Sequence, residues 1–202
     1  MLTCDPRVLP GGHLVKRISF SEAAELAYFG AKVLHPATVQ PAIEKNIPVR
    51  ILNSRRPESP GTLIVNETVH STVPLKSIAC KRAITVVEVR SLRMLMAHGF
   101  LRRIFEVFDR YRTSVDMVTT SEVCVALTID HCGALADIEA ELSRIAEVSI
   151  VQNQAVVCVV GDALRETPGL GARIFGALRD VNVRMISQGA SFNNVSFVVD
   201  GA

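Results

Sequence analysis

The feature that most constrains the fold of this 202-residue chain is an internal repeat in its second half. Short apolar segments recur there in the same order, at an offset of about 70 residues. The matched positions are 85–89 with 155–159, Gly99 with Gly169, 103–105 with 173–175, 115–118 with 183–186, and 125–130 with 195–200. This period is too long for a solenoid, and it predicts two small domains of the same fold.

Hydrophobic periodicity gives the order of elements in the first copy. The expected elements are strand 85–91, helix 99–112, strands 114–120 and 123–130, helix 134–146 and strand 147–153. This βαββαβ order is typical of a ferredoxin-like domain. The second copy lacks the last helix and the last strand. The apolar segment 75–81, which precedes the first copy, could supply the missing edge strand.

Residues 1–68 have a different pattern, in which helices and strands are mixed as in an α/β domain. The expected elements are helices 20–29 and 36–45 and strands 47–53 and 62–65. Ser19 or Ser21 is the expected N-cap of the first helix. The polar segment 66–74 reads as a linker, and we place a domain boundary there.

Composition excludes several classes of function. A net charge of +2 predicts no strong attraction to nucleic acid or to a membrane surface. The apolar runs are far shorter than the ~20 residues of a membrane-spanning helix. The five cysteines form no C-x-x-C pair, which favours a reducing cytoplasm over a disulfide framework. No histidine, cysteine and carboxylate cluster has metal-ligand spacing, so we expect no metal site.

Six segments carry recognisable motifs. They are "TCDPR" (3–7), "EAAELAYFGAKVLHPATVQPA" (22–42), "GTLI" (61–64), "SLRMLMAHGFL" (91–101), "SVDMVTTSEVCVALT" (114–128) and "RMISQGASFNNVSFVV" (184–199). The first three resemble the end of the amino-acid-kinase domain of aspartokinases, and the other three resemble the paired ACT domains of these enzymes. The resemblance covers essentially the whole chain, and it is strongest to the lysine-sensitive, monofunctional type.

The resemblance implies a fold and an activity. It implies a kinase-domain piece at 1–68, a linker and edge strand at 69–84, a first ACT domain at 85–153, and the remainder of the second at 154–202. One ACT domain is inserted in the other in this family. For the full enzyme it implies ATP (as Mg-ATP) and L-aspartate as substrates, L-lysine as allosteric inhibitor, and a homodimer formed through the ACT domains.

The same resemblance assigns a nucleotide-binding set and no catalytic residue. The set is Cys4, Asp5, Arg7, Lys32 and Val33. Cations near ATP phosphates stabilise binding and phosphoryl transfer. Alternatively, Lys32 is a solvated lysine near a helix C-terminus and Arg7 is a turn residue. The chain departs from the family at Cys4, where threonine is usual, and it lacks the Lys-Phe-Gly-Gly phosphate loop. We therefore expect a fragment that does not catalyse alone.

A second set is assigned to the allosteric amino acid. It comprises Met94, Gly99, Phe100, Leu101, Val115, Asp116, Thr120, Ser121 and Glu122. We expect the helix N-terminus at Gly99 to hold a carboxylate and to lie near the start of the second strand. Asp116 there would bind an ammonium group. The second copy has Arg184 at this position, so it should not bind the same group.

Alternatives remain for these residues and for the function. Asp116 is otherwise a solvent-facing strand residue or a turn cap, Met94, Phe100 and Leu101 are core residues, and 120–122 is a plain turn. A stand-alone regulatory subunit is the second function considered, although segment 30–36, "GAKVLHP", is unnecessary for a pure sensor. An RNA-binding module is the third, and the lack of aromatic residues in strands 85–91 and 123–130 disfavours it.

Overall fold

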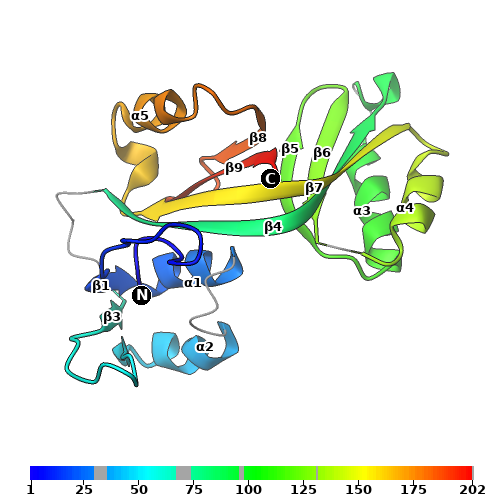
Figure 1. The fold of residues 1–202 in the computed structure, drawn as a ribbon. Helices are drawn as coiled ribbons and strands as arrows, with labels where there is room; N and C mark the ends of the chain where they lie inside the picture. Colours follow the sequence, from blue (N-terminus) through cyan, green and yellow to red (C-terminus); the bar gives the residue numbers. More distant parts are fainter. Residues whose placement is uncertain (30–35, 67–73, 96–97, 131, 202) are drawn as a thin grey trace. The chain divides into compact units, whose positions relative to one another are not determined.

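The computed structural model describes residues 1–29, 36–66, 74–95, 98–130 and 132–201 (Figure 1). The chain divides into two compact units. Unit 1 comprises Met1–Lys81, Val156–Asn182 and Gln188–Phe197, and unit 2 comprises Arg82–Ala155, Val183–Ser187 and Val198–Ala202. No helix within the described ranges has the length and apolar character needed to cross a membrane.

Two long strands supply residues to both units. The larger sheet has the strand order β5-β6-β4-β7-β9-β8. Its strands are β4 (Leu75–Arg90), β5 (Val115–Thr120), β6 (Cys124–Ile129), β7 (Glu147–Gly161), β8 (Val183–Gln188) and β9 (Asn194–Asp200). The expected strands 75–81 and 85–91 are one strand, β4. Ala83 in β4 and Asn153 in β7 have φ of 59° and 55°, in the left-handed region, near where each strand passes between units.

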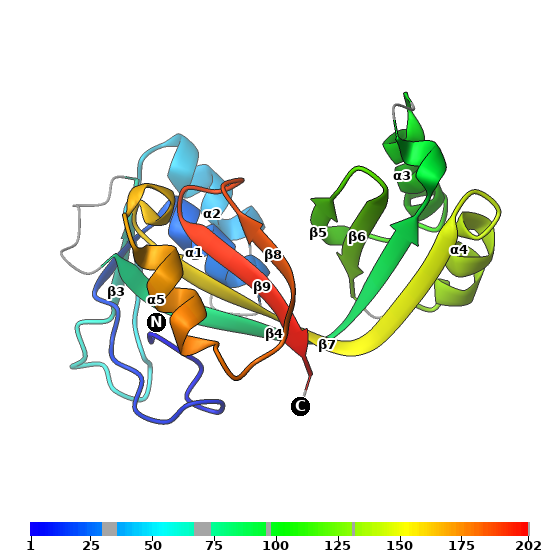
Figure 2. The same cartoon turned by 90° about the horizontal axis from the view of Figure 1, so that it is seen from above.

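Unit 2 holds the first copy of the repeat. Helices α3 (Phe100–Arg110) and α4 (Leu135–Leu142) lie side by side on one face of its strands (Figures 1 and 2). The helices and strands share one core, formed by Val87, Val89, Phe100, Ile104, Val107, Phe108, Val125, Leu127, Ile129, Ile138 and Leu142. These residues recur at helical and at strand spacing, and the burial of such faces is the main stabilising term.

Unit 1 combines the N-terminal segment with most of the second copy, whose residues Val183–Ser187 and Val198–Ala202 belong to unit 2. Its small sheet has the order β1-β3-β2, with β1 (Arg17–Ser19) parallel to β3 (Thr62–Val65) and β2 (Val49–Ile51) antiparallel to β3. Its helices are α1 (Phe20–Tyr28), α2 (Pro36–Glu44) and α5 (Leu170–Ala177). Within this unit, α5 covers one face of the second copy's strands and α1 lies on the other side (Figures 1 and 2).

The helices occur where periodicity predicts them, and their starts have clear physical causes. Ser19 is the N-cap of α1, and it forms a capping box with Glu22. The repeated glycines Gly99 and Gly169 are the N-caps of α3 and α5, with φ of 76° and 75°. Glycine adopts this conformation at little cost, which explains why it recurs at both positions. The short strand β1 and the 3-10 turns η1 (Leu92–Met94) and η2 (Leu164–Glu166) were not predicted.

Candidate functional site

Asp116 lies at a β-bulge. Val115 pairs with Ile129 and Met117 pairs with Thr128, so Asp116 is the extra residue on β5. The Met117 N–H donates to the buried hydroxyl of Thr128 at 2.9 Å, which closes the irregular ladder. Bulges re-aim a side chain relative to the strand and are common beside functional sites. The bulge therefore accounts for a half-buried carboxylate within an otherwise apolar strand.

The turn between β5 and β6 lies at the other end of the strand. The Ser121 N–H donates to the Cys124 carbonyl at 2.8 Å, and the Ser91 N–H donates to the Val123 carbonyl at 2.9 Å. The second bond joins the turn to the end of β4, directly before η1. Thr120, Ser121 and Glu122 are exposed around this turn. The structure thus brings residues 120–122 to the same end of the unit as η1.

The start of α3 belongs to the same end. Among the described residues no side chain caps this helix terminus, and its first N–H groups and the positive end of the helix dipole are suited to an acceptor. Phe100 is 2% exposed and belongs to the core, whereas its neighbour Leu101 is 40% exposed. Met94 and Val115 are partly buried against the core. Phe100 is therefore a packing residue whose contact with a ligand would come through its backbone.

The expectation that the helix N-terminus lies near the start of the second strand is wrong. Strands β4 and β5 are both antiparallel to β6, so they run in the same direction, and α3, which joins them, runs back. Its N-terminus lies at the end of β5, near Thr120, and Asp116 lies towards the start. Four strand residues separate them, which is about 13 Å. Within a single chain, the α3 N-terminus and Asp116 therefore belong to two separate clusters.

The second copy differs in charge at the position of Asp116. Arg184 on β8 donates to the Asp200 carboxylate at 2.7 Å. By the repeat, the corresponding residues of the first copy are Asp116 and Asp130, which are both acidic. A cation and an anion pair in the second copy, whereas the equivalent residues of the first copy are both acidic. The two copies therefore carry opposite charge at the position of residue 116.

The N-terminal loop holds three of the five nucleotide-set residues. Arg7 donates to both carboxylate oxygens of Asp5, the shortest bond being 2.7 Å. The guanidinium hydrogen bond and the Arg7 N–H lower the pKa of Asp5 to about 2, and Asp5 raises the pKa of Arg7. The Cys4 thiol donates to the Leu9 carbonyl at 3.5 Å. The other two members, Lys32 and Val33, lie outside the described residues.

The described part of the chain contains no group of three or more histidine, cysteine or acidic side chains that could hold a metal ion. The cysteines among these residues are all free. Burial raises the pKa of the Cys158 thiol to about 12, against a smaller lowering by a hydrogen bond with Ser196. Cys158 is consequently a neutral core thiol rather than a nucleophile.

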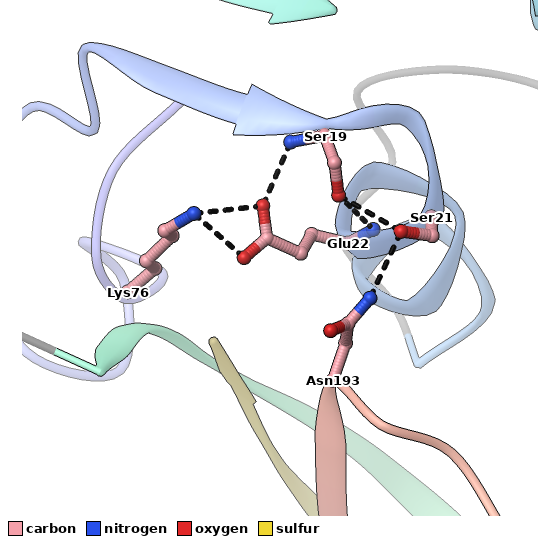
Figure 3. A network of polar contacts seen from close by, with 5 residues as sticks. All are labelled: Ser19, Ser21, Glu22, Lys76 and Asn193. Atoms are coloured by element: carbon pink, nitrogen blue, oxygen red, sulfur yellow. Dashed lines mark hydrogen bonds and ion pairs between the residues drawn. The ribbon is translucent and has the colours of Figure 1, made fainter. Parts of the chain in front are cut away.

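A polar cluster at the start of α1 was missed by sequence reasoning. Glu22 is 1% exposed, and its carboxylate accepts hydrogen bonds from the Ser19 N–H at 2.7 Å and from Lys76 Nζ at 3.0 Å. Lys76 Nζ also makes an ion-pair contact with the second carboxylate oxygen at 2.7 Å. Figure 3 shows Lys76 and Asn193 pointing towards this turn from two separate segments. The S-x-x-E pattern at Ser19–Glu22 indicates the cap, but nothing local indicates Lys76.

The fold and these sites define a class of protein, in which a segment of an amino acid kinase domain is joined to a pair of ACT domains. Comparison with known families agrees: residues 1–53 match the amino acid kinase family, and residues 157–202 match the ACT domain.

The chain belongs to the aspartokinase family. It is 41% identical over 207 residues to lysine-sensitive aspartokinase 3 of Escherichia coli. The aligned region covers 98% of this chain and 46% of that protein. A crystal structure of E. coli aspartokinase III with aspartate and ADP superposes with a TM-score of 0.88, at 41% identity, over 99% of this chain and 46% of that one. A crystal structure of the same enzyme with lysine and aspartate superposes with a TM-score of 0.84, at 41% identity, over 100% of this chain and 46% of that one. The chain thus spans less than half the length of these relatives.

Proposed function

We propose that this chain is the regulatory part of an aspartate kinase, that it senses L-lysine through its first ACT domain, and that it carries part of the ATP site. One observation carries the effector assignment. At equivalent positions of the two copies, the Arg184–Asp200 ion pair is replaced by Asp116 and Asp130. L-lysine carries two ammonium groups and one carboxylate, so it complements this acidic position.

The carboxylate of the effector needs a second group, and the uncapped start of α3 is suited to it. Because this terminus and Asp116 lie at opposite ends of β5, we propose that each site is completed by a second copy of the chain. An isologous dimer would then hold two equivalent sites. The related E. coli enzyme has been crystallised with lysine and aspartate, which supports the choice of ligand.

The proposed mechanism is a population shift. Lysine would favour the dimer arrangement in which the kinase domain is less active, which requires tighter binding to that arrangement. For the whole protein, we propose phosphorylation of L-aspartate by Mg-ATP in the cytoplasm. The domain boundaries 1–68, 69–84, 85–153 and 154–202 belong to the same proposal. We expect no turnover of aspartate and ATP by this chain alone, and clear activity would overturn that part.

A stand-alone regulatory subunit acting on a separate catalytic chain is the other candidate. The ACT pair would serve both functions equally well. The match of residues 1–53 to the amino acid kinase family favours the first, because a pure sensor has no use for that segment.

Isothermal calorimetry tests the effector assignment. The wild-type chain is titrated with L-lysine and, separately, with L-threonine. We expect heat with lysine at millimolar concentration. Asp116→Asn removes a charged hydrogen-bond acceptor worth about 1.5–3 kcal/mol, so the dissociation constant should rise roughly 10- to 100-fold. Arg184→Gln is the matched control in the second copy. Equal effects of the two substitutions, or no heat with lysine, would refute the assignment.

A further inference from the structure

The second copy of the repeat uses its counterpart of the effector turn to hold the kinase segment. The turn 189–193, between β8 and β9, corresponds to the turn 121–123 between β5 and β6 of the first copy and is two residues longer. Asn193 Nδ2 donates to Ser21 Oγ at 2.9 Å, and Asn194 Nδ2 donates to Glu25 Oε2 at 2.6 Å. Both acceptors lie on α1. The end of this turn in the second copy is therefore bonded to a helix of the same chain.

Strand β4 holds the same helix from a second direction. The buried Glu22 carboxylate contacts Lys76, whose side chain is 10% exposed (Figure 3). A carboxylate that is 1% exposed is costly without a cation, so this contact fixes where α1 lies. The adjacent Ser77 Oγ donates to the carbonyls of Leu2 and Thr3, at 3.1 Å each. The start of β4 thus contacts both α1 and the loop that precedes Asp5.

The loop of the second copy is itself fixed by η2. The Arg165 guanidinium lies 3.5 Å from the centre of the Phe192 ring and donates to the Gly189 carbonyl at 3.2 Å. A cation over an aromatic face, with a hydrogen bond to the neighbouring backbone, restricts the loop. Asn193 and Asn194 therefore contact α1 from a loop whose conformation is restricted.

We propose that Lys76 and the 189–194 loop of the second ACT domain form a docking surface for α1 and transmit the effector signal to the kinase segment. The two copies would then divide the work, since the first binds the amino acid and the second binds α1. The transmission part rests on the proposed function, and the docking part does not. Strand β4 runs from this surface to the start of η1, because Lys76 lies near the start of the strand and Arg90 at its end.

Hydrogen–deuterium exchange of the whole chain, read on α1 peptides by mass spectrometry, tests the docking part. Asn193→Ala and Lys76→Met should each raise the exchange rate of α1 amides by about tenfold. Arg184→Gln, which breaks the exposed pair in unit 2, is the control and should leave α1 unchanged. The asparagine variant removes no buried charge, so it decides the matter even if Lys76→Met unfolds the chain. Unchanged α1 exchange in Asn193→Ala would overturn the docking surface.

Adding L-lysine tests the transmission part. In the wild-type chain, lysine should change α1 exchange, and Asn193→Ala should abolish that change while calorimetry still detects lysine binding. Lysine binding without any change in α1 exchange would overturn transmission alone. If calorimetry detects no lysine binding, the proposed function and the transmission fail together, and the substitution experiment still decides the docking surface.

Discussion

The Glu22–Lys76 pair should show strong energetic coupling. In Lys76→Met, a carboxylate that is 1% exposed keeps the Ser19 N–H but loses its cation. Removing one partner of a buried pair costs about 3–5 kcal/mol, which is a large part of the ~5–15 kcal/mol that stabilises a domain. In Glu22→Gln, the amide can still close the capping box, so the cost should be smaller, about 1–3 kcal/mol.

The double variant Glu22→Gln/Lys76→Met isolates the interaction. It leaves no buried charge, so its loss should be smaller than the sum of the single losses by about 2 kcal/mol. The assay is urea denaturation followed by circular dichroism on the four chains. Glu106→Gln, which breaks the exposed Arg102–Glu106 pair, should change stability by less than about 0.5 kcal/mol. Additivity within about 0.5 kcal/mol would refute the reasoning.

Three further outcomes are expected. Gly99→Ala and Gly169→Ala should each lower the free energy of unfolding, measured by thermal unfolding, by about 1–2 kcal/mol, because both residues have positive φ. An added Cβ would meet no atom within 4 Å, so this backbone strain is the whole expected effect. Only Gly99→Ala should also weaken lysine binding. Thr128→Val should leave the Met117 N–H unpaired at the bulge, cost about 1–3 kcal/mol in urea denaturation, and also weaken lysine binding. The Cys158 thiol, with a pKa of about 12, should resist a thiol reagent at pH 8. In the unfolded chain this thiol has its ordinary pKa of 9.0. The stability that comes from burying the neutral thiol should therefore be fully present below pH 9 and be lost as the pH rises towards 12.

The repeat and the periodicity were enough to predict two ferredoxin-like domains, and the resemblance to aspartokinases implied that they are ACT domains. These patterns did not predict that β4 is one strand through both units. Two strands, 75–81 and 85–91, were expected instead, because no local sequence pattern indicates that the chain continues as a strand through the left-handed Ala83. The position of the α3 N-terminus could have been derived from topology, since a helix that joins two strands running in the same direction must run opposite to them.

The features that most shape the candidate sites depend on distant residues. Asp116 was assigned from the resemblance and supported by its inverted charge in the repeat, whereas the bulge that carries it depends on register with β6. Lys76 is 54 residues from Glu22 in sequence, and no periodicity connects them. The capping box at Ser19 is local, and its sequence pattern predicts it.

Backbone nuclear magnetic resonance during an L-lysine titration tests the central claim most directly, because it reports on both copies at once. The account predicts that amide signals of Gly99, Leu101, Asp116 and Ser121 shift with lysine concentration. The equivalent signals of Gly169 and Arg184 should stay in place, and Asp116→Asn should suppress the shifts of the first set. Direct binding shifts centred on Arg184, or shifts in the first copy that survive Asp116→Asn at the same lysine concentration, would contradict it.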